Sequence, residues 1–301
     1  MDDRLRRVSA GLILWGLLGA CVPPETEERD FGEESPMLAI QKQGTMTIAV
    51  PANAPPYAFA EDEIQGFAVD IGRLVADDLG VDAEFLMVDD EEMPDLVGGP
   101  DPIVDGDGRV DLAVTTLPIT SNLYKIRSRN KGIEVSTPYF ITHQRLLAPE
   151  NSSVTNVTDL AGKKVCSLAD DETGVRLDSI EPDVEIVDVT LVEECVALLT
   201  RGAADAATAT EDKLYDIQML LDQQPRTEPF KIVGDQLTTV AFGLLADRGM
   251  GSYVSSVINE AKSEGRWAEI YDEWIAPLSE RPAEPPELTL YDAASLFPLE
   301  N

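Results

Sequence analysis

From Thr45 onward, short apolar runs alternate with amphipathic stretches, and this alternation constrains the fold of the chain more than any other feature. Residues 46–50 (MTIAV) and 83–88 (AEFLMV) have the length and composition of buried strands. Between them, residues 66–80 carry apolar side chains at helical spacing and end at Gly80. Because alternating strands and helices are typical of α/β domains, the pattern predicts an α/β fold.

A second series of the same kind follows farther along the chain. Residues 160–168 are predicted to contain a strand, and residues 193–210 a helix, a glycine turn and another strand. Two longer extended segments, at 138–148 and 236–246, stand before and after this series. We therefore expect the chain to leave one lobe along the first segment and to return to it along the second.

The length of the chain also favours two lobes, because about 260 ordered residues exceed the usual size of one hydrophobic core. We place the first lobe at residues 45–142 and 240–277 and the second at 143–239, with two strands crossing the hinge. Residues 278–301 are rich in proline and have no clear period, so we expect a strap or a loose tail there.

The first twenty residues have the pattern of a secretory signal. Three arginines among the first seven residues precede an apolar run at 12–18, which is too short to cross a bilayer of roughly 30 Å as a folded anchor. Residues 18–21 (LGAC) resemble a bacterial lipobox, which implies cleavage before Cys21 and a diacylglycerol on its sulfur. An ordinary signal peptide that is cut nearby is the alternative.

We therefore expect an exported protein, held by lipid on the outer face of the bacterial cytoplasmic membrane, with residues 21–44 as a polar tether. The chain has 56 acidic and 23 basic residues and a formal charge of −33 at pH 7. Nucleic acid and anionic membrane surfaces are unfavourable partners for such a chain, so the lipid would be its only membrane contact. We interpret the acidity as a solvated surface that keeps the protein soluble.

Once Cys21 carries lipid, Cys166 and Cys195 remain as a pair in an oxidising compartment. A disulfide between them is expected, and two buried thiols are the alternative. Neither cysteine has a CxxC partner, and the single histidine, His143, is far from both in sequence, so no metal site is expected.

Several segments then match, in order, a pattern known from one protein family: PPYAF (55–59), GFAVDIGRLVADDLG (66–80), VDLAVTTLPIT (110–120), VSTPYF (135–140), DLAGKKVCSL (159–168), RGAADAATATED (201–212), FGLL (242–245) and EGRWAEIYDEWIAP (264–277). The chain resembles solute-binding protein family 3, the type 2 periplasmic binding fold of polar amino-acid substrate-binding proteins. TPYFITHQRLL, KKVCS and EECVALL look most like the glutamate-binding lipoproteins of Gram-positive bacteria. The resemblance implies a monomer of two α/β lobes that closes on a small polar ligand and presents it to an ABC permease, without a cofactor.

An amino acid carries a carboxylate and an ammonium, so its site needs cationic or amide donors for the first and a carboxylate for the second. The resemblance places Tyr57 and the hydroxyls of Thr115, Thr116 and Thr120 at the cleft. The position of the family's arginine holds Leu123. Five or six inserted residues would bring Arg129 to that place; Arg127 and a solvated basic loop are the alternatives.

In the second lobe, the family's Gly-Ser-Thr turn aligns with Asp170, Asp171 and Glu172, and Asp171 is a candidate contact to the ligand. These acids disfavour glutamate and favour a ligand with a neutral or cationic side chain. The family's amino-binding aspartate is Thr210 here, and either Glu211 or Asp212 could replace it.

Two other functions remain open. The departures from the family pattern are compatible with a ligand-sensing or degenerate binding protein whose partner is another protein. An exported dehydratase-like enzyme on the same fold is less expected, because the sequence offers no Ser-His or Cys-His arrangement and His143 falls in a predicted hinge strand.

The lipobox interpretation leads to a simple test. Globomycin, which blocks the lipoprotein signal peptidase, should leave an unprocessed precursor in cells that express the chain, visible as a slower band on a denaturing gel. Normal maturation in the presence of globomycin would contradict lipidation at Cys21.

Overall fold

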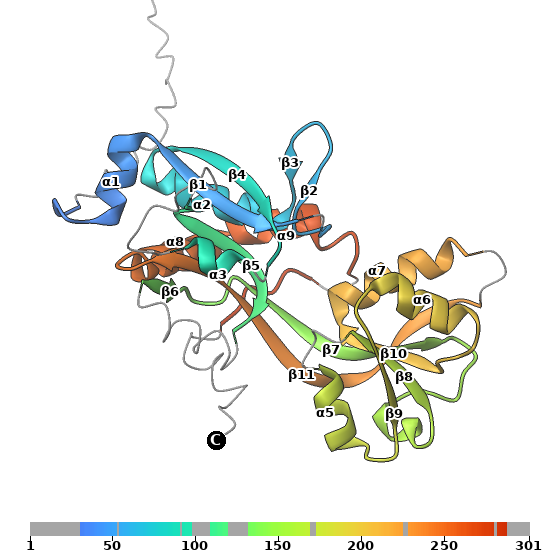
Figure 1. The fold of residues 1–301 in the computed structure, drawn as a ribbon. Helices are drawn as coiled ribbons and strands as arrows, with labels where there is room; N and C mark the ends of the chain where they lie inside the picture. Colours follow the sequence, from blue (N-terminus) through green and yellow to red (C-terminus); the bar gives the residue numbers. More distant parts are fainter. Residues whose placement is uncertain are drawn as a thin grey trace, which may run out of the picture. The chain divides into compact units, whose positions relative to one another are not determined.

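The computed structural model describes residues 31–52, 54–90, 92–97, 109–119, 132–168, 173–224, 228–279 and 282–287 (Figure 1). The chain divides into two units, Met1–Asp30 and Phe31–Asn301, and all described residues belong to the second. The predicted signal segment and Cys21 lie outside the described residues. Among the helices that are described, none is both long and apolar enough to cross a membrane.

The described strands form one nine-stranded sheet and a separate two-stranded hairpin of β2 (Phe59–Ala60) and β3 (Ile64–Gln65). β6 (Ile133–Val135) pairs with β11 beside the main path of the large sheet. The main path follows the order β4 (Asp82–Val88), β1 (Thr45–Pro51), β5 (Leu112–Pro118), β11 (Phe230–Asp247), β7 (Phe140–Pro149), β10 (Ala206–Thr210), β8 (Lys164–Leu168) and β9 (Glu185–Val189).

Parallel strands stand at both ends of this order, and antiparallel strands stand in its middle. β1 pairs in parallel with β4 and β5, and β8 with β10 and β9, whereas β7 and β11 run antiparallel to each other and to their outer neighbours. Two parallel α/β sheets are thus joined through a two-stranded antiparallel ribbon. This confirms the predicted α/β fold with two hinge-crossing strands.

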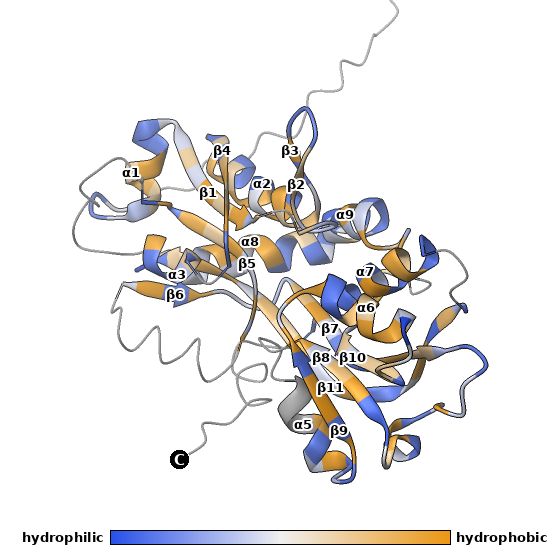
Figure 2. Ribbon diagram, turned by 45° about the vertical axis from the view of Figure 1, so that its right-hand side comes forward, coloured by the Kyte–Doolittle hydropathy of each residue, from blue (hydrophilic) through white to orange (hydrophobic). Residues whose placement is uncertain are grey.

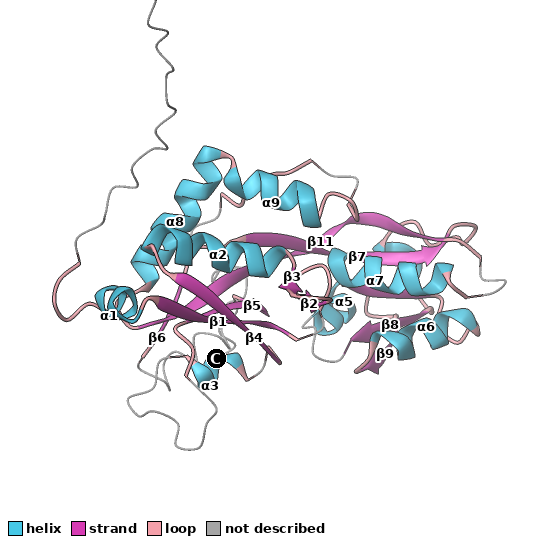
Figure 3. Ribbon diagram, turned by 90° about the horizontal axis from the view of Figure 1, so that it is seen from above, coloured by secondary structure: helices cyan, strands magenta, loops and turns pink. Residues whose placement is uncertain are grey.

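Helices cover both faces of the sheet, and the alternation of side chains along each strand supplies a core on each face. On β5, Leu112 and Val114 enter the core under α1 (Pro36–Gln43), α2 (Phe67–Leu79), α8 (Gly251–Glu264) and α9 (Arg266–Trp274). Ala113 enters the opposite core with α3 (Met93–Leu96). Figure 3 shows α2, α8 and α9 grouped on one face, and Figure 2 shows the hydrophobic residues concentrated along the strands.

The other parallel half repeats this arrangement. Leu147 of β7 packs with α6 (Val192–Thr200) and α7 (Glu211–Asp222), while Leu146 packs on the other face with α5 (Thr173–Ile180) and the 3-10 turn Val157–Leu160. The predicted disulfide is present: Cys166 of β8 and Cys195 of α6 are both buried and bonded to each other. It closes a loop of 29 residues, which in the chain-entropy model contributes about 3.5 kcal/mol.

The ribbon of β7 and β11 has an irregularity near its middle. The two strands pair from Phe230 to Val233 and again from Thr238 to Phe242, and the register shifts between these stretches. Gly234 lies in the shift with a φ of 75°, where an L side chain would be strained. Its carbonyl accepts a hydrogen bond from Arg145 of β7. The extended segment predicted at 236–246 is thus the second part of one longer, bent strand that begins at Phe230.

Two segments near the ends of the described residues are attached to the folded body. Residues 36–43, assigned to the tether, form α1 and bury Met37 and Ile40 in the first core. At the other end, Lys262 of α8 donates hydrogen bonds from Nζ to the carbonyls of Pro138 (2.7 Å) and Pro286 (3.0 Å). This lysine therefore ties the segment after α9 to the start of β7.

The pKa of Lys262 gives this attachment a measurable signature. Burial lowers the pKa from 10.5 to about 8, so between those values the unfolded chain binds more protons than the native chain and native stability rises with pH. The free energy of unfolding of the native chain should therefore increase from pH 7 to 9.5 relative to that of Lys262→Met. Urea denaturation at several pH values measures this difference. Lys231→Met, at an exposed position on β11, is the control; parallel curves for all three chains would refute the assignment.

Candidate functional site

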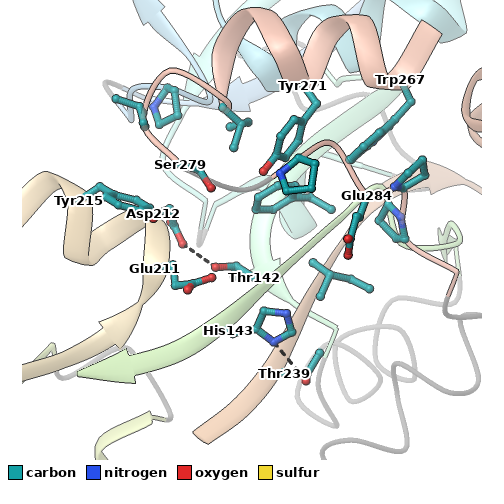
Figure 4. A pocket seen from close by; sticks show the side chains of 18 of the residues that line it. Thr142, His143, Glu211, Asp212, Tyr215, Thr239, Trp267, Tyr271, Ser279 and Glu284 are labelled. Atoms are coloured by element: carbon teal, nitrogen blue, oxygen red, sulfur yellow. Dashed lines mark hydrogen bonds between the residues drawn. The ribbon is translucent and has the colours of Figure 1, made fainter. Parts of the chain in front are cut away.

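A pocket of about 520 Å³ lies where the hinge ribbon, α7, α9 and the segment after α9 meet (Figure 4). The hinge contributes the stretch from Phe140 to His143 on β7, together with Thr239 on β11. The pocket is thus built from elements that belong to both halves of the sheet. Its remaining lining residues are Pro56, Tyr57, Glu211, Asp212, Tyr215, Gln236, Trp267, Tyr271, Ile275, Leu278, Ser279, Pro282, Glu284, Pro285, Pro286 and Glu287.

Tyr57 reaches the pocket because the loop before β2 is pinned to the start of α2. The amides of Phe67 and Ala68 donate to the carbonyls of Pro56 and Tyr57 (2.9 and 2.8 Å). Gly66 makes this approach possible, since a Cβ atom there would lie 2.4 Å from the Tyr57 carbonyl oxygen. These backbone contacts explain how the loop brings the Tyr57 ring to the pocket.

The Tyr57 side chain is 1 % exposed, and its ring packs against Phe67, Phe140 and Phe242. Its hydroxyl forms no hydrogen bond of ordinary length and angle with the described residues, although the Asp212 carboxylate lies near enough to act on it as an acceptor. Burial, and then the charge of Asp212, raise the pKa of Tyr57 well above its usual value of 10.0. A neutral hydroxyl is thus available to a ligand, and a buried hydroxyl without a well-formed hydrogen bond is costly.

The two acids at the start of α7 have different partners. Glu211 is buried and forms an ion pair with Arg145 of β7, with 3.2 Å between Oε1 and Nη1. Asp212 accepts a hydrogen bond from Thr142 (3.2 Å), also on β7, and faces the pocket (Figure 4). The positive end of the helix dipole stabilises both carboxylates. Of the two alternatives for an ammonium-binding acid, Asp212 has the more suitable position, because Glu211 already has a cationic partner.

Asp216, one turn along α7, adds negative charge behind Asp212. Burial raises its pKa to about 6, the positive charge of Lys213 opposes this rise, and the charge of Asp212 adds to it. The deprotonated form therefore dominates at neutral pH and is lost in mild acid. A bound cation would stabilise this carboxylate, whereas a bound anion would be repelled by it.

Thr115 and Thr116, predicted ligand contacts, bind a carboxylate of the chain itself. Thr115 Oγ1 donates to Asp90 Oδ1 (2.7 Å), the Thr116 amide donates to the same oxygen (3.0 Å), and Thr116 Oγ1 bonds to Asp90 Oδ2. Neither threonine lines the pocket. Burial raises the pKa of Asp90, and these hydrogen bonds oppose the rise. Sequence analysis missed Asp90 because it lies 25 residues before Thr115 and follows β4, which is separated from β5 by β1, so only the fold brings it to the threonines.

The sequence also did not assign the aromatic wall formed by Trp267 and Tyr271 of α9. Their four-residue spacing places both on one helix face, and the rings stack with centroids 5.3 Å apart. Trp267 Nε1 donates to the Tyr139 carbonyl (2.7 Å), which fixes the indole. The four-residue spacing of Trp267 and Tyr271 is visible in the sequence EGRWAEIYDEW. The same spacing is also typical of a helix face that packs into the core, so it does not identify a binding site by itself.

The remaining predicted contacts, Thr120, Arg129 and Asp171, lie outside the described residues, as do Arg127, Asp170 and Glu172. The basic anchor for a carboxylate therefore stays a prediction. Within the described part of the chain, no group of three or more His, Cys, Asp or Glu side chains could hold a metal ion.

The sequence model of the bacterial extracellular solute-binding proteins, family 3, matches residues 46–277, which include the hinge, α7 and α9. The chain belongs to this family. This family 3 protein is 26 % identical over 230 residues to the ABC transporter glutamine-binding protein GlnH of Bacillus subtilis, a match that covers 74 % of this chain and 76 % of the relative. It is 24 % identical over 256 residues to the glutamate-binding protein GluB of Corynebacterium efficiens, with 81 % and 80 % of the two chains covered.

Among solved structures, an ancestral cationic amino acid solute binding protein matches the family 3 protein with a TM-score of 0.61 and 20 % identity. The match covers 80 % of this chain and 99 % of the other. At this identity the likeness concerns the fold alone. It confirms the type 2 periplasmic binding fold that the sequence motifs predicted.

The occupation of Thr115 by Asp90 leads to a prediction about stability. Thr115→Val removes a buried hydroxyl that donates to Asp90 and accepts from the Leu117 amide, so the free energy of unfolding in urea should fall by about 1–2 kcal/mol. Thr47→Val, on neighbouring β1, should change it by less than about 0.5 kcal/mol. Because the pocket does not include Thr115, ligand affinity should stay within about twofold; a larger loss of affinity would place this hydroxyl on the ligand.

Proposed function

We propose that this family 3 protein binds a small polar solute with an amino group in the pocket beside the hinge and delivers it to an ABC permease, without catalysis. The observation that carries the proposal is the meeting of Asp212 and the buried hydroxyl of Tyr57 in one pocket. The first supplies an acceptor for an ammonium group, and the second supplies a hydroxyl that can donate or accept. The names of the relatives, which bind glutamine or glutamate, support an amino acid as the solute class.

The proposed mechanism is closure of the two halves around the ribbon of β7 and β11. Tyr57 stands before α2 on one half, and Asp212 stands at the start of α7 on the other. A ligand that contacts both is stabilised most when the halves exclude water, because charge pairs are stronger at low dielectric. The closed form would then be the form that a permease recognises.

We assign the carboxylate of the solute to Arg129, with Arg127 as the alternative. Thr120 and Asp171 remain proposed contacts on the two halves. The acids at 170–172 support a neutral or cationic side chain over an acidic one. The proposal further includes export, lipidation at Cys21 and a monomeric state.

A second candidate function is ligand sensing, or a degenerate site that serves a protein partner. The observation that favours it is the internal carboxylate of Asp90 on Thr115 and Thr116, since two of the predicted ligand hydroxyls are already occupied. A solute that binds would favour transport; a chain that binds no solute but is recovered with a specific membrane receptor would favour sensing.

The first experiment is a thermal-shift screen of the chain from Val22 onward against the common amino acids, polyamines and small carboxylates. A ligand at 100 times its Kd should stabilise the native state by about 2.7 kcal/mol and raise the melting temperature visibly. For the strongest ligand, Asp212→Asn should weaken binding by about tenfold or more, because a charge-assisted hydrogen bond is lost. Asp222→Asn, at the exposed end of the same helix, is the matched control.

Two results would contradict the proposal. If the panel contains no ligand that stabilises the chain, the solute-binding role fails. If a ligand binds equally well to Asp212→Asn and to the native chain, the site lies elsewhere on the molecule.

A further inference from the structure

We propose that the C-terminal strap, defined here as residues 278–279 and 282–287, is a wall of the binding site, and that Glu284 on it selects ligands that carry an organic cation. The cation would be a guanidinium or an alkylammonium group on the side chain of the solute. The inference rests on the proposed function and deepens it, because it names both the ligand class and a residue that determines specificity.

The strap has a defined position on the folded body. Leu278 and Ser279 continue from α9 through backbone hydrogen bonds to the Ile275 carbonyl (3.0 and 3.1 Å). Farther along, Pro286 is buried and its carbonyl accepts the second hydrogen bond of Lys262 Nζ. Between these two attachments Ala283 packs against the first core. The strap is therefore held at both ends and in its middle.

This position makes the strap one side of the pocket. Leu278, Ser279 and Glu284 line it together with the strap prolines and Glu287. Figure 4 shows Glu284 across the pocket from Glu211 and Asp212, so carboxylates approach the same space from α7 and from the strap. A ligand between them would contact acids on two sides.

The charged residues that line the pocket are all acidic. Four carboxylates belong to it, those of Glu211, Asp212, Glu284 and Glu287, and no lysine or arginine of the described residues does. The charge of Glu211 is compensated by Arg145 from outside the pocket. None of the other three carboxylates forms an ion pair with a described lysine or arginine, so the pocket attracts positive charge and repels anions.

Acidic residues alone do not identify a ligand, and two further features do. Aromatic side chains, among them Tyr215 and Tyr271, form much of the lining, and aromatic faces attract organic cations. The buried hydroxyl of Tyr57, which lines the same pocket, forms no hydrogen bond of ordinary length and angle with the described residues and can accept an N–H donor. A bare metal ion would instead require a shell of several oxygen ligands, and the described residues provide no such cluster.

An extended cation with several N–H donors satisfies all of these groups together. Its donors can reach Asp212 and Glu284 from opposite sides, while its hydrocarbon part lies against the aromatic rings. The strap then contributes a contact that the two halves of the sheet do not provide. Its carboxylate distinguishes a charged side chain from a neutral one of the same shape.

Calorimetric titration of the chain from Val22 onward with two matched pairs of ligands tests the inference. L-arginine and L-citrulline differ by a guanidinium against a ureido group, and L-lysine and Nε-acetyl-lysine by an ammonium against an amide. The native chain should bind the cationic member of at least one pair about tenfold more tightly. Glu284→Gln should reduce that preference by about fivefold and Glu284→Lys further, while the affinity for the neutral member stays within about twofold. Glu150→Gln, an equal charge change at an exposed site outside the pocket, should leave both affinities unchanged.

The outcomes separate the inference from the function on which it rests. A cationic preference that both Glu284 variants retain would overturn the role of the strap, as would equal binding of charged and neutral members. Binding of neutral amino acids only, L-glutamine for example, would overturn the inference and leave solute binding intact. Binding of no amino acid at all would overturn both.

Discussion

The antiparallel pairing of β7 with β11 is the interaction on which the rest of the structure depends. Each half of the large sheet is parallel, and a parallel sheet needs helices on both faces to bury it. The ribbon enters the cores of both halves, with Phe140 and Phe242 in one and Leu147 and Phe230 in the other. Because the chain crosses twice, the two halves stay joined, and the pocket forms beside the ribbon.

The charged groups of the pocket near the hinge have partners on the ribbon. Arg145 and Thr142 come from β7, and they hold Glu211 and Asp212 at the start of α7. These contacts are short in space because β10, which precedes α7, pairs directly with β7. Strand order therefore places Glu211 and Asp212 in the lining, and the strap adds Glu284 and Glu287.

The sequence was sufficient for the fold because the fold depends on local patterns repeated many times. The helix predicted at 66–80 ends at Gly80 as expected, since helical spacing and a glycine cap specify it. The site was less predictable. Tyr57, Glu211 and Asp212 line the pocket, whereas Thr115 and Thr116 hold Asp90 and do not line it; a role for any of them in ligand binding stays a prediction. Residue type and spacing cannot show that a side chain elsewhere in the chain has already taken a hydroxyl.

The shift in register between Val233 and Thr238 has a thermodynamic consequence for the whole molecule. Arg145 bonds both to Gly234 inside this shift and to Glu211 at the rim of the pocket, so bending of the ribbon and placement of the ligand-facing helix are mechanically connected. A substitution at the shift could then alter the fraction of molecules in a binding-competent form without contacting the ligand. The apparent affinity would change in proportion to that fraction, and by reciprocity a bound solute would stiffen the ribbon.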